Sequence, residues 1–458
     1  MNETWMNTET VRANSEFSAP GRSRSGLSFS SVSAGGVVQM GAVVSVEHSA
    51  QQRKPVPEER PPVLILNLFY TGLGIAHNLR GYGLRVIGLS ADRQAYGRFS
   101  RFCEVRESPN SQENPEELKS YLLGLAGELH GAIIFPTRDA DVLFLDHYRE
   151  ELEPHFRLAI PPRECLQNVV DKGKLVEIAL RAGVSVPRTL VVKTREHISR
   201  VGDVVGYPCV VKPVRSADWR GGHNWEKVGG RKAFLVQNVI ELEKEYAQIA
   251  SVTPELLIQE WIPGRPDQIV ILGGYVGEGA DPLAYFTARK LIQSPEDFGT
   301  GCIVESVDLP RLLEPTIRLW RALKYRGMAE VEYKRDARTD EYKLIEINTR
   351  HWDWHRLGMA SGVNVSWAAY CDLAGISISK KNPPILSAKW IAEDATLLYL
   401  LRGVYHREIR LRSLQKDFSG RRLYGIFAWN DPLPLFYNLF GVLLPEVFKQ
   451  VWSKLRAG

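Results

Sequence analysis

The sequence predicts a protein of mixed α/β and α+β class, in which a Rossmann-like domain with a parallel sheet precedes a larger domain of mostly antiparallel strands. The first third of the chain alternates short apolar runs with helical segments, and this βαβ order is typical of a parallel sheet. From residue 268 onwards, the strands look antiparallel. The last two of them form a predicted hairpin at 327–348, whose polar residues carry the strongest functional signal in the chain.

The composition is that of a soluble, globular protein with more than one domain. At 458 residues the chain is long enough for two or three domains with sizeable cores. Charged residues make up 24% and hydrophobic residues 44%, and the formal net charge is only +5. Because basic residues are interleaved with acids, nothing indicates nucleic-acid binding. The five cysteines are scattered without Cys-x-x-Cys spacing, which argues against a disulfide framework or a zinc site and favours a cytoplasmic protein.

We expect four regions along the chain. They are a disordered tail at 1–60, the parallel-sheet domain at 61–165, the larger domain at 166–378 with lobes at about 188–262 and 263–378, and a helical C-terminal extension at 379–458. The tail is rich in Ser, Gly, Thr and Pro and has almost no apolar periodicity. It lacks a compact apolar run before a cleavage site, so we expect no secretory signal, with a transit peptide as the weaker alternative.

The C-terminal extension contains an apolar stretch at 432–445. This stretch has three prolines and is shorter than the ~20 residues that a membrane-spanning helix needs. We therefore expect no transmembrane segment. Docking of the stretch on the core of the protein is favoured over peripheral membrane contact.

In the first domain, the continuous apolar run at 63–69 predicts a strand that is buried on both faces. The following elements are strands at 84–90 and 131–136 and helices near 115–130 and 139–150. Gly72-x-Gly74 begins a helix directly after the first strand. Because the third glycine of a dinucleotide-binding fingerprint is absent, we interpret this motif as a helix-opening turn.

In the second domain, a helix begins near Asp171, runs to Ala182 and is closed by Gly183. The remaining predicted elements are strands at 188–192 and 208–213 around a helix at 195–204, a strand at 256–260, antiparallel strands at 268–276, 283–292 and 302–307, and a helix at 310–324. Residues 215–230 are glycine-rich and too many for a tight hairpin, so we predict a loop that acts as a lid.

The hairpin ends in the pattern Glu346-x-Asn348-x-Arg350, which places three polar side chains on one face of a strand. A turn centred on Thr339 would set Glu332 directly opposite Glu346. Two facing carboxylates destabilise a sheet unless a cation lies between them. Carboxylate and amide oxygens suit Mg²⁺, or Mn²⁺, together with substrate phosphates.

Three segments in this order resemble the ATP-grasp superfamily, and in particular its carboxylate–amine ligase branch, to which the D-aspartate ligases belong. They are Val210-Val-Lys212-Pro213, the strand and turn at 256–264, and Glu346-x-Asn348. The resemblance covers roughly residues 62–375 and implies an ATP-grasp fold preceded by a pre-ATP-grasp domain, which in this family often helps to bind the acyl substrate. It also implies ATP and Mg²⁺ (or Mn²⁺) as cofactors.

The resemblance assigns nucleotide-binding roles to six residues. Two lysines would bind the phosphates of ATP, Lys172 at a helix start and Lys212 at a strand end, with Lys174 as the alternative to the first. Glu260 and the main chain of Trp261 and Ile262 would recognise adenine, although Trp261 could equally be a core residue. Asp267 would take the ribose hydroxyls, one residue away from the commonest spacing.

The same resemblance assigns the metal ligands and the residues that stabilise phosphoryl transfer. Glu332, Glu346 and Asn348 would bind the metal, with Glu330 as an alternative ligand on the same face. Arg350 would meet the charge that develops on the transferring phosphoryl group. Arg289 and Lys290 are further candidates, and because adjacent strand residues point opposite ways we expect only one of them to face the site.

His351 and His355 follow directly after Arg350. We expect them to line the carboxylate or amine pocket rather than to bind a metal, because no third ligand of the expected type is nearby.

The function implied is ATP-dependent formation of an amide bond through an acyl phosphate, with release of ADP and phosphate. The substrates would be a small-molecule carboxylate and an amine, of amino-acid or small peptide-like character. The alternatives are an ATP-grasp carboxylase and a non-catalytic nucleotide-binding protein. A homo-oligomer is compatible with the sequence.

Overall fold

The computed structural model describes residues 60–220, 223–295, 297–378, 386–405 and 417–445. All of them belong to one compact unit, residues 56–458. The predicted disordered tail at 1–60 lies outside the described residues except for Arg60, and so do parts of the C-terminal extension.

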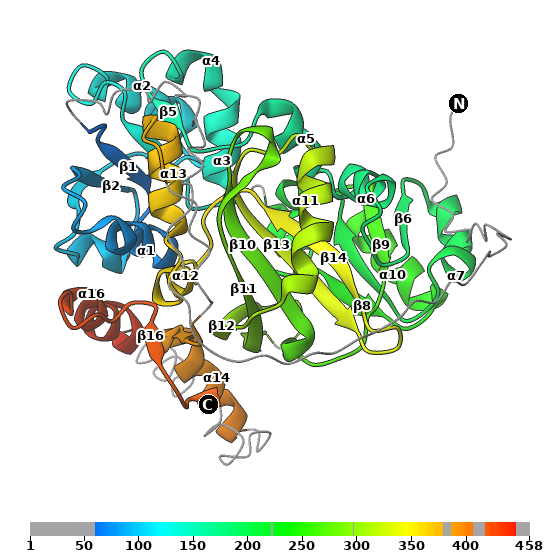
Figure 1. The fold of residues 1–458 in the computed structure, drawn as a ribbon. Coiled ribbons are helices and arrows are strands. Elements are labelled where there is room, and N and C mark those ends of the chain that lie inside the picture. The colour runs from blue at the N-terminus through cyan, green and yellow to red at the C-terminus, as the bar shows by residue number, and fades with distance from the viewer. Residues whose placement is uncertain (1–59, 221–222, 296, 379–385, 406–416, 446–458) are drawn as a thin grey trace, which may run out of the picture. The chain divides into compact units, whose positions relative to one another are not determined.

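A five-stranded parallel sheet forms the first domain, as predicted (Figure 1). Its strands are β1 (Val63–Leu66), β2 (Val86–Ser90), β3 (Glu104–Glu107), β4 (Ile133–Phe135) and β5 (Arg157–Leu158), in the order β3-β2-β1-β4-β5. The predictions missed β3, which is polar, and β5, which has two residues. The associated helices are α1 (Tyr70–Leu79), η1 (Tyr96–Phe99), α2 (Pro115–Leu125), α3 (Asp139–His147), α4 (Arg149–Leu152) and α5 (Arg163–Val170).

The two glycines at the start of α1 allow close packing. A Cβ atom on Gly72 would lie 2.0 Å from the carbonyl oxygen of Asn67, and one on Gly74 would lie 2.6 Å from Cε1 of His355. The motif therefore brings the chain close to β1 and to the segment after β14, in keeping with its interpretation as a helix-opening turn.

A four-stranded antiparallel sheet forms the smaller lobe of the second domain. Its strands are β6 (Thr189–Val192), β7 (Cys209–Pro213), β8 (Phe234–Val236) and β9 (Leu256–Glu260), in the order β6-β9-β7-β8. The helices of this part are α6 (Lys172–Arg181), η2 (Arg195–Arg200), α7 (Val201–Val204) and α10 (Val239–Ile249). Asp171 caps α6 by accepting a hydrogen bond from the amide of Lys174.

The segment at 215–230 differs from the predicted loop. It contains two short helices, α8 (Ser216–Arg220) and α9 (Asn224–Lys227), with residues 221–222 outside the described chain. Trp219 is buried and stacks on Phe234 at 6.0 Å between ring centroids. Glycine content suggested a loop, whereas this aromatic anchor folds α8 onto the small sheet. Its movement over bound nucleotide stays a prediction.

A seven-stranded sheet forms the larger lobe. Its strands are β10 (Ile269–Val276), β11 (Pro282–Ser294), β12 (Thr300–Ser306), β13 (Gly327–Asp336), β14 (Glu341–Asn348), β15 (Lys389–Ile391) and β16 (Arg422–Tyr424), in the order β14-β13-β10-β11-β12-β15-β16. The neighbours from β14 to β15 are antiparallel, as expected, whereas β15 and β16 are parallel. The extension expected to be helical thus adds two strands to this sheet.

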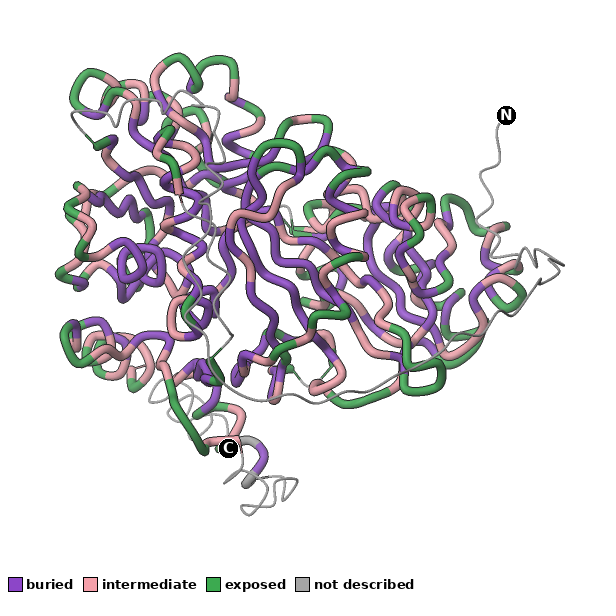
Figure 2. Tube along the Cα trace, viewed as in Figure 1, coloured by how far each residue is buried: buried purple, intermediate pink, exposed green. Residues whose placement is uncertain are grey.

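The large sheet is buried on both faces (Figure 2). Along β10, Ile269 and Ile271 enter a core with the aromatic residues after β14, whereas Val270 and Leu272 enter a core with α6 and α11. This alternation follows from the two-residue repeat of a strand. The remaining helices are η3 (Pro266–Gln268), η4 (Glu278–Ala280), η5 (Pro310–Leu312), α11 (Leu313–Ala322), α12 (Arg356–Ala360), α13 (Val365–Ala374), α14 (Glu393–Tyr405), α16 (Leu433–Tyr437) and η6 (Asn438–Leu443).

The apolar C-terminal stretch docks on the protein, as favoured above, but on the parallel-sheet domain. Asp431 is buried and binds His77 at 2.9 Å, Ser100 and the amide of Arg101. Tyr437 donates its hydroxyl to the carbonyl of Arg93. Within the described chain, no helix has the length and apolar character needed to cross a membrane.

Candidate active site

A cavity of about 1290 Å³ lies where the two lobes and the parallel-sheet domain meet. The small lobe contributes residues of β7 and β9, the large lobe residues of β11, β13 and β14, and the first domain residues near the start of α3. Of the predicted site residues, those that line the cavity are Lys172, Lys212, Glu260, Trp261, Ile262, Lys290, Glu332, Glu346, Asn348 and Arg350.

The register of the β13–β14 hairpin is the predicted one. Glu332 pairs with Glu346, and Glu330 pairs with Asn348. The turn itself is shorter by one residue than a turn centred on Thr339, because Tyr333 pairs with Leu344, and a bulge at Ile345 restores the register. Without this bulge the carboxylate of Glu346 would point to the opposite face of the sheet.

The carboxylate of Glu346 interacts electrostatically with four lysines. Burial raises the pKa of Glu346, but the positive charges of Lys172, Lys212, Lys290 and Lys232 outweigh it, so the pKa falls below its ordinary value. The side chain is therefore ionised at neutral pH. A carboxylate among four cations leaves this part of the cavity with excess positive charge, as an anionic ligand requires.

Lys212 is buried and Lys172 is half-buried. Lys212 donates to Oε1 of Gln259 at 2.8 Å, and burial lowers its pKa to about 8. Lys172 donates to Oγ of Ser216 at 2.8 Å, and burial lowers its pKa as well. Lys174, the alternative to Lys172, is exposed and does not line the cavity.

The two glutamates of β13 have different partners. Glu332 accepts a hydrogen bond from Nζ of Lys290 at 2.6 Å, whereas Glu330 accepts one from Nδ2 of Asn348 at 2.9 Å. Burial, and next the charge of Glu332, raise the pKa of Glu330 to about 8. Glu330 therefore holds its proton more tightly than an ordinary glutamate, whereas Glu332 forms an ion pair with Lys290.

Only one of the adjacent residues Arg289 and Lys290 faces the cavity, as expected. Lys290 is buried in it, whereas Arg289 points to the other face of β11, where it pairs with Glu305. The candidate role of Arg289 in phosphoryl transfer is therefore wrong, because side chains alternate along a strand.

Arg350 links the large lobe to the first domain. Its Nε donates to Oδ1 of Asp139 at 2.8 Å, and Arg220 of α8 pairs with the same carboxylate at 3.0 Å. Burial raises the pKa of Asp139, but these two guanidinium groups hold it below its ordinary value. Asp139 and the carbonyl of His351, which accepts a hydrogen bond from Nη1 at 3.0 Å, thus position the guanidinium group of Arg350 at the cavity wall.

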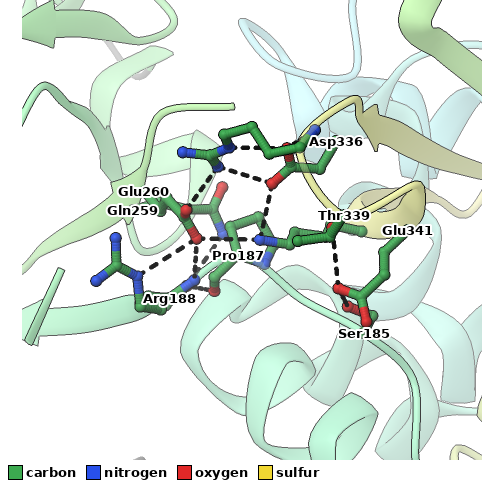
Figure 3. Close-up of polar contacts among 11 residues, drawn as sticks. Ser185, Pro187, Arg188, Gln259, Glu260, Asp336, Thr339 and Glu341 are labelled. Carbon is green, nitrogen blue, oxygen red and sulfur yellow. Dashed lines mark hydrogen bonds and ion pairs between the residues drawn. The ribbon is translucent and has the colours of Figure 1, made fainter. Parts of the chain in front are cut away.

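The carboxylate of Glu260 makes several polar contacts within the protein (Figure 3). It accepts hydrogen bonds from Arg338 at 2.8 Å, from Lys343 at 3.2 Å and from the amide of Arg188 at 3.3 Å. Burial raises the pKa of Glu260, but the amide and Lys343 outweigh this effect and lower it. The predicted adenine contact by this side chain is therefore corrected to a structural contact between β9 and the β13–β14 turn.

Asp267, the residue predicted to contact the ribose, lies outside the cavity. Its neighbours Gly264, Arg265 and Pro266 line the cavity, whereas Asp267, in η3, does not. The ribose contact assigned to Asp267 is thus not supported by its position.

His351 and His355 are completely buried beneath the cavity wall, His351 against Ser366 at 3.0 Å and His355 against the carbonyl of Trp352 at 2.6 Å. The prediction that they line the pocket is wrong. The residues between them, Trp352, Asp353 and Trp354, line it instead.

Sequence reasoning also missed Lys232, which lines the cavity and donates to Thr300 at 3.4 Å. The signal was present, because Gly229 and Gly230 precede it closely, as glycines precede the lysine of a phosphate-binding loop.

The metal-binding potential of the cavity rests on few groups. In the described ranges, no group of three or more His, Cys, Asp or Glu side chains could hold a metal ion. A cation between Glu332, Glu346 and Asn348 would thus bind two carboxylates and one amide oxygen, and would need further oxygens from a ligand. This donor set fits Mg²⁺, which commonly takes one or two carboxylates plus substrate phosphates.

Comparison with known proteins identifies relatives at low identity. No family model matches the chain. The chain is 24% identical over 310 residues to D-aspartate ligase of Enterococcus faecium (strain Aus0004), which covers 64% of this chain and 72% of that protein.

Two solved structures share the fold. The biotin carboxylase–β,γ-ATP complex from Campylobacter jejuni has a TM-score of 0.57 at 20% identity, covering 72% of this chain and 74% of that one. L-amino acid ligase from Bacillus licheniformis has a TM-score of 0.51 at 18% identity, covering 69% of this chain and 75% of that one. The chain therefore shares its fold with these two solved structures and is similar in sequence to D-aspartate ligase.

Proposed function

We propose that this protein joins a small carboxylic acid to an amine at the expense of ATP, through an acyl phosphate, and releases ADP and phosphate. The observation that carries the proposal is the arrangement of Lys172, Lys212 and Lys290 around Glu346 in one cavity with Arg350. Such a cavity offers cations for a triphosphate and for the phosphoryl group in transit.

ATP would lie between the lobes, with its phosphates toward Lys172 and Lys212. The main chain of Trp261 and Ile262 would contact adenine, because both residues line the cavity at the end of β9. A structure with the same fold was solved as a β,γ-ATP complex. Mg²⁺, when bound by Glu332, Glu346 and Asn348, would neutralise phosphate charge.

The chemistry would proceed in two displacements. The substrate carboxylate attacks the γ-phosphorus, the bond to ADP breaks, and an acyl phosphate forms. The amine nitrogen then attacks the acyl carbon, and phosphate leaves with the electron pair of the broken C–O bond. Lys290 and Arg350 would stabilise the negative charge on the transferred group, and Asp139 would orient Arg350.

The substrates would be amino acids or small peptide-like molecules, as the names D-aspartate ligase and L-amino acid ligase suggest for the relatives. The sequence-based expectation of a cytoplasmic protein belongs to this proposal. Whether the chain forms a homo-oligomer does not affect it, because every residue invoked lies in one chain.

The proposal predicts ADP release from ATP and Mg²⁺ that depends on both an acid and an amine. Pairs of amino acids, D-aspartate included, would be screened by a coupled ADP assay. With the active acid labelled with ¹⁸O in its carboxylate, one label should appear in the released phosphate.

Three results would contradict the proposal. Unlabelled phosphate, or AMP with pyrophosphate, would exclude the acyl phosphate. ADP release that requires bicarbonate instead of an amino acid would indicate a carboxylase. ATP binding without turnover on any pair would indicate a non-catalytic protein.

A second prediction separates the two neighbouring lysines of α6. Lys172→Met should weaken the binding of a nonhydrolysable ATP analogue about 10-fold or more, since a hydrogen bond to a charged group contributes roughly 1.5–3 kcal/mol. Lys174 lies two residues further along the helix and is exposed, so Lys174→Met should bind the analogue like the wild type. Isothermal titration calorimetry measures both. Equal affinities of the two variants would exclude Lys172 from the phosphate site.

A further inference from the structure

Asp353 is a cavity carboxylate that forms no ion pair within the described chain, and the charges of Arg350 and Lys232 reach it from beyond ion-pair distance. It lines the cavity between Trp352 and Trp354 and is half-buried. Its Oδ1 accepts a hydrogen bond from Oγ1 of Thr71, at the start of α1, at 2.8 Å. This bond fixes the orientation of the carboxylate.

Most of the other carboxylates of the cavity have polar or charged partners within the protein. Asp139 pairs with Arg350 and Arg220, and Glu332 pairs with Lys290. Glu260 forms ion pairs with Arg338 and Lys343. Glu330 accepts a hydrogen bond from the amide of Asn348, and Glu346 interacts electrostatically with four lysines.

Four acids that line the cavity within the described ranges form no ion pair: Glu330, Glu346, Asp297 and Asp353. Glu330 is hydrogen-bonded to Asn348 and Glu346 lies among four lysines, which leaves Asp297 and Asp353. Asp297 is exposed, so water solvates its charge. Asp353 is half-buried, so water solvates its charge less completely than that of Asp297.

We propose that Asp353 binds the ammonium group of an amino-acid substrate. This assignment rests on the proposed ligase function and names the group by which that site recognises its substrate. Two indole rings beside a carboxylate suit a cation, since aromatic faces attract positive charge. The lysines and Arg350 would at the same time attract the anionic groups, so the two charges of an amino acid are bound at different parts of one cavity.

The ammonium group could belong to the acyl donor or to the amine acceptor, and a partial reaction separates these sources. Hydroxylamine, uncharged at neutral pH, replaces the acceptor and traps the acyl phosphate as a hydroxamate. The KM for the donor is measured in this reaction, and the KM for the acceptor in amide formation at saturating donor. The amino-acid pair found active in the screen above is used in both assays.

Asp353→Asn keeps an oxygen acceptor for Thr71 but loses the charge. We expect the KM for the ammonium-bearing substrate to rise about 10- to 100-fold, as for loss of a charged hydrogen bond, with little change in kcat. A higher donor KM in the hydroxamate assay assigns the ammonium to the donor, and a change in the acceptor KM alone assigns it to the acceptor. If the ammonium belongs to the donor, the des-amino analogue of that donor, succinate in the case of D-aspartate, should form the hydroxamate equally well with variant and wild type.

Asp297→Asn is the matched control, and its KM values should equal those of the wild type. Unchanged KM values for both substrates in Asp353→Asn would overturn this assignment and leave the ligase function intact. A wild type that forms neither hydroxamate nor amide with any amino acid would instead refute the proposed function itself.

Discussion

Replacement of Glu346 by glutamine should reduce the rate of ADP release at least about 100-fold, the scale on which one electrostatic contact to a transition state contributes. Glutamine has the same shape but removes the negative charge that the structure places among Lys172, Lys212, Lys290 and Lys232. The four lysines would then repel one another and would lose the carboxylate that faces Glu332. A metal ion and the phosphates would both be held less well.

The control for this variant is Glu341→Gln on the same strand. Glu341 is exposed and lies outside the cavity, so its loss should leave turnover unchanged. Thermal unfolding checks that both variants fold, since Glu346 fills no part of the hydrophobic cores. Full activity of Glu346→Gln, or activity that persists in excess EDTA, would refute the metal assignment.

Replacement of Lys212 by methionine should weaken the binding of an ATP analogue about 10- to 100-fold at pH 7. Lys212 is buried at the end of β7 and its ammonium group points to Gln259 within the cavity. Because burial lowers its pKa to about 8, the wild type should lose affinity as the pH rises above 8. The variant should lack this component of the pH dependence, and Lys212→Arg should retain affinity at high pH.

The same pKa shift predicts that the stability of the folded protein without nucleotide changes with pH in the opposite direction to the nucleotide affinity. The pKa of Lys212 is lower in the folded protein, about 8, than the ordinary 10.5, so the unfolded chain binds more protons between these values. The contribution of Lys212 to stability is therefore unfavourable at neutral pH and improves as the pH rises from 8 to 10.5.

Lys212→Met should consequently unfold at a higher temperature than the wild type at pH 7 without nucleotide, and the difference should shrink toward pH 10.5. Differential scanning calorimetry across this pH range measures the two unfolding temperatures.

The binding prediction has its own contrary outcome. If Lys212→Met bound the ATP analogue with wild-type affinity at pH 7, Lys212 would be excluded from the nucleotide site.

The sequence by itself determined the parts of the site that lie on single elements or on adjacent strands. The pairing of Glu332 with Glu346, and the position of Lys212 at a strand end, follow from a two-residue repeat and a short turn, both local properties of the chain. The rule that neighbouring strand residues face opposite ways also predicted that one of Arg289 and Lys290 enters the cavity. It could not say which one, because that depends on the partner strands of β11.

Only the tertiary structure decided which polar groups compensate one another. Arg350 meets Asp139 across 211 residues, and Asp353 meets Thr71 across 282. Glu260 is 78 residues from Arg338, and this contact removes its carboxylate from the list of ligands for adenine. Charge compensation depends on distances of a few ångströms between elements that are remote in sequence, and no local pattern encodes such distances. For the same physical reason, the position of the Asp353 carboxylate in the cavity, bonded to Thr71 and without an ion pair in the described chain, follows only from the tertiary structure.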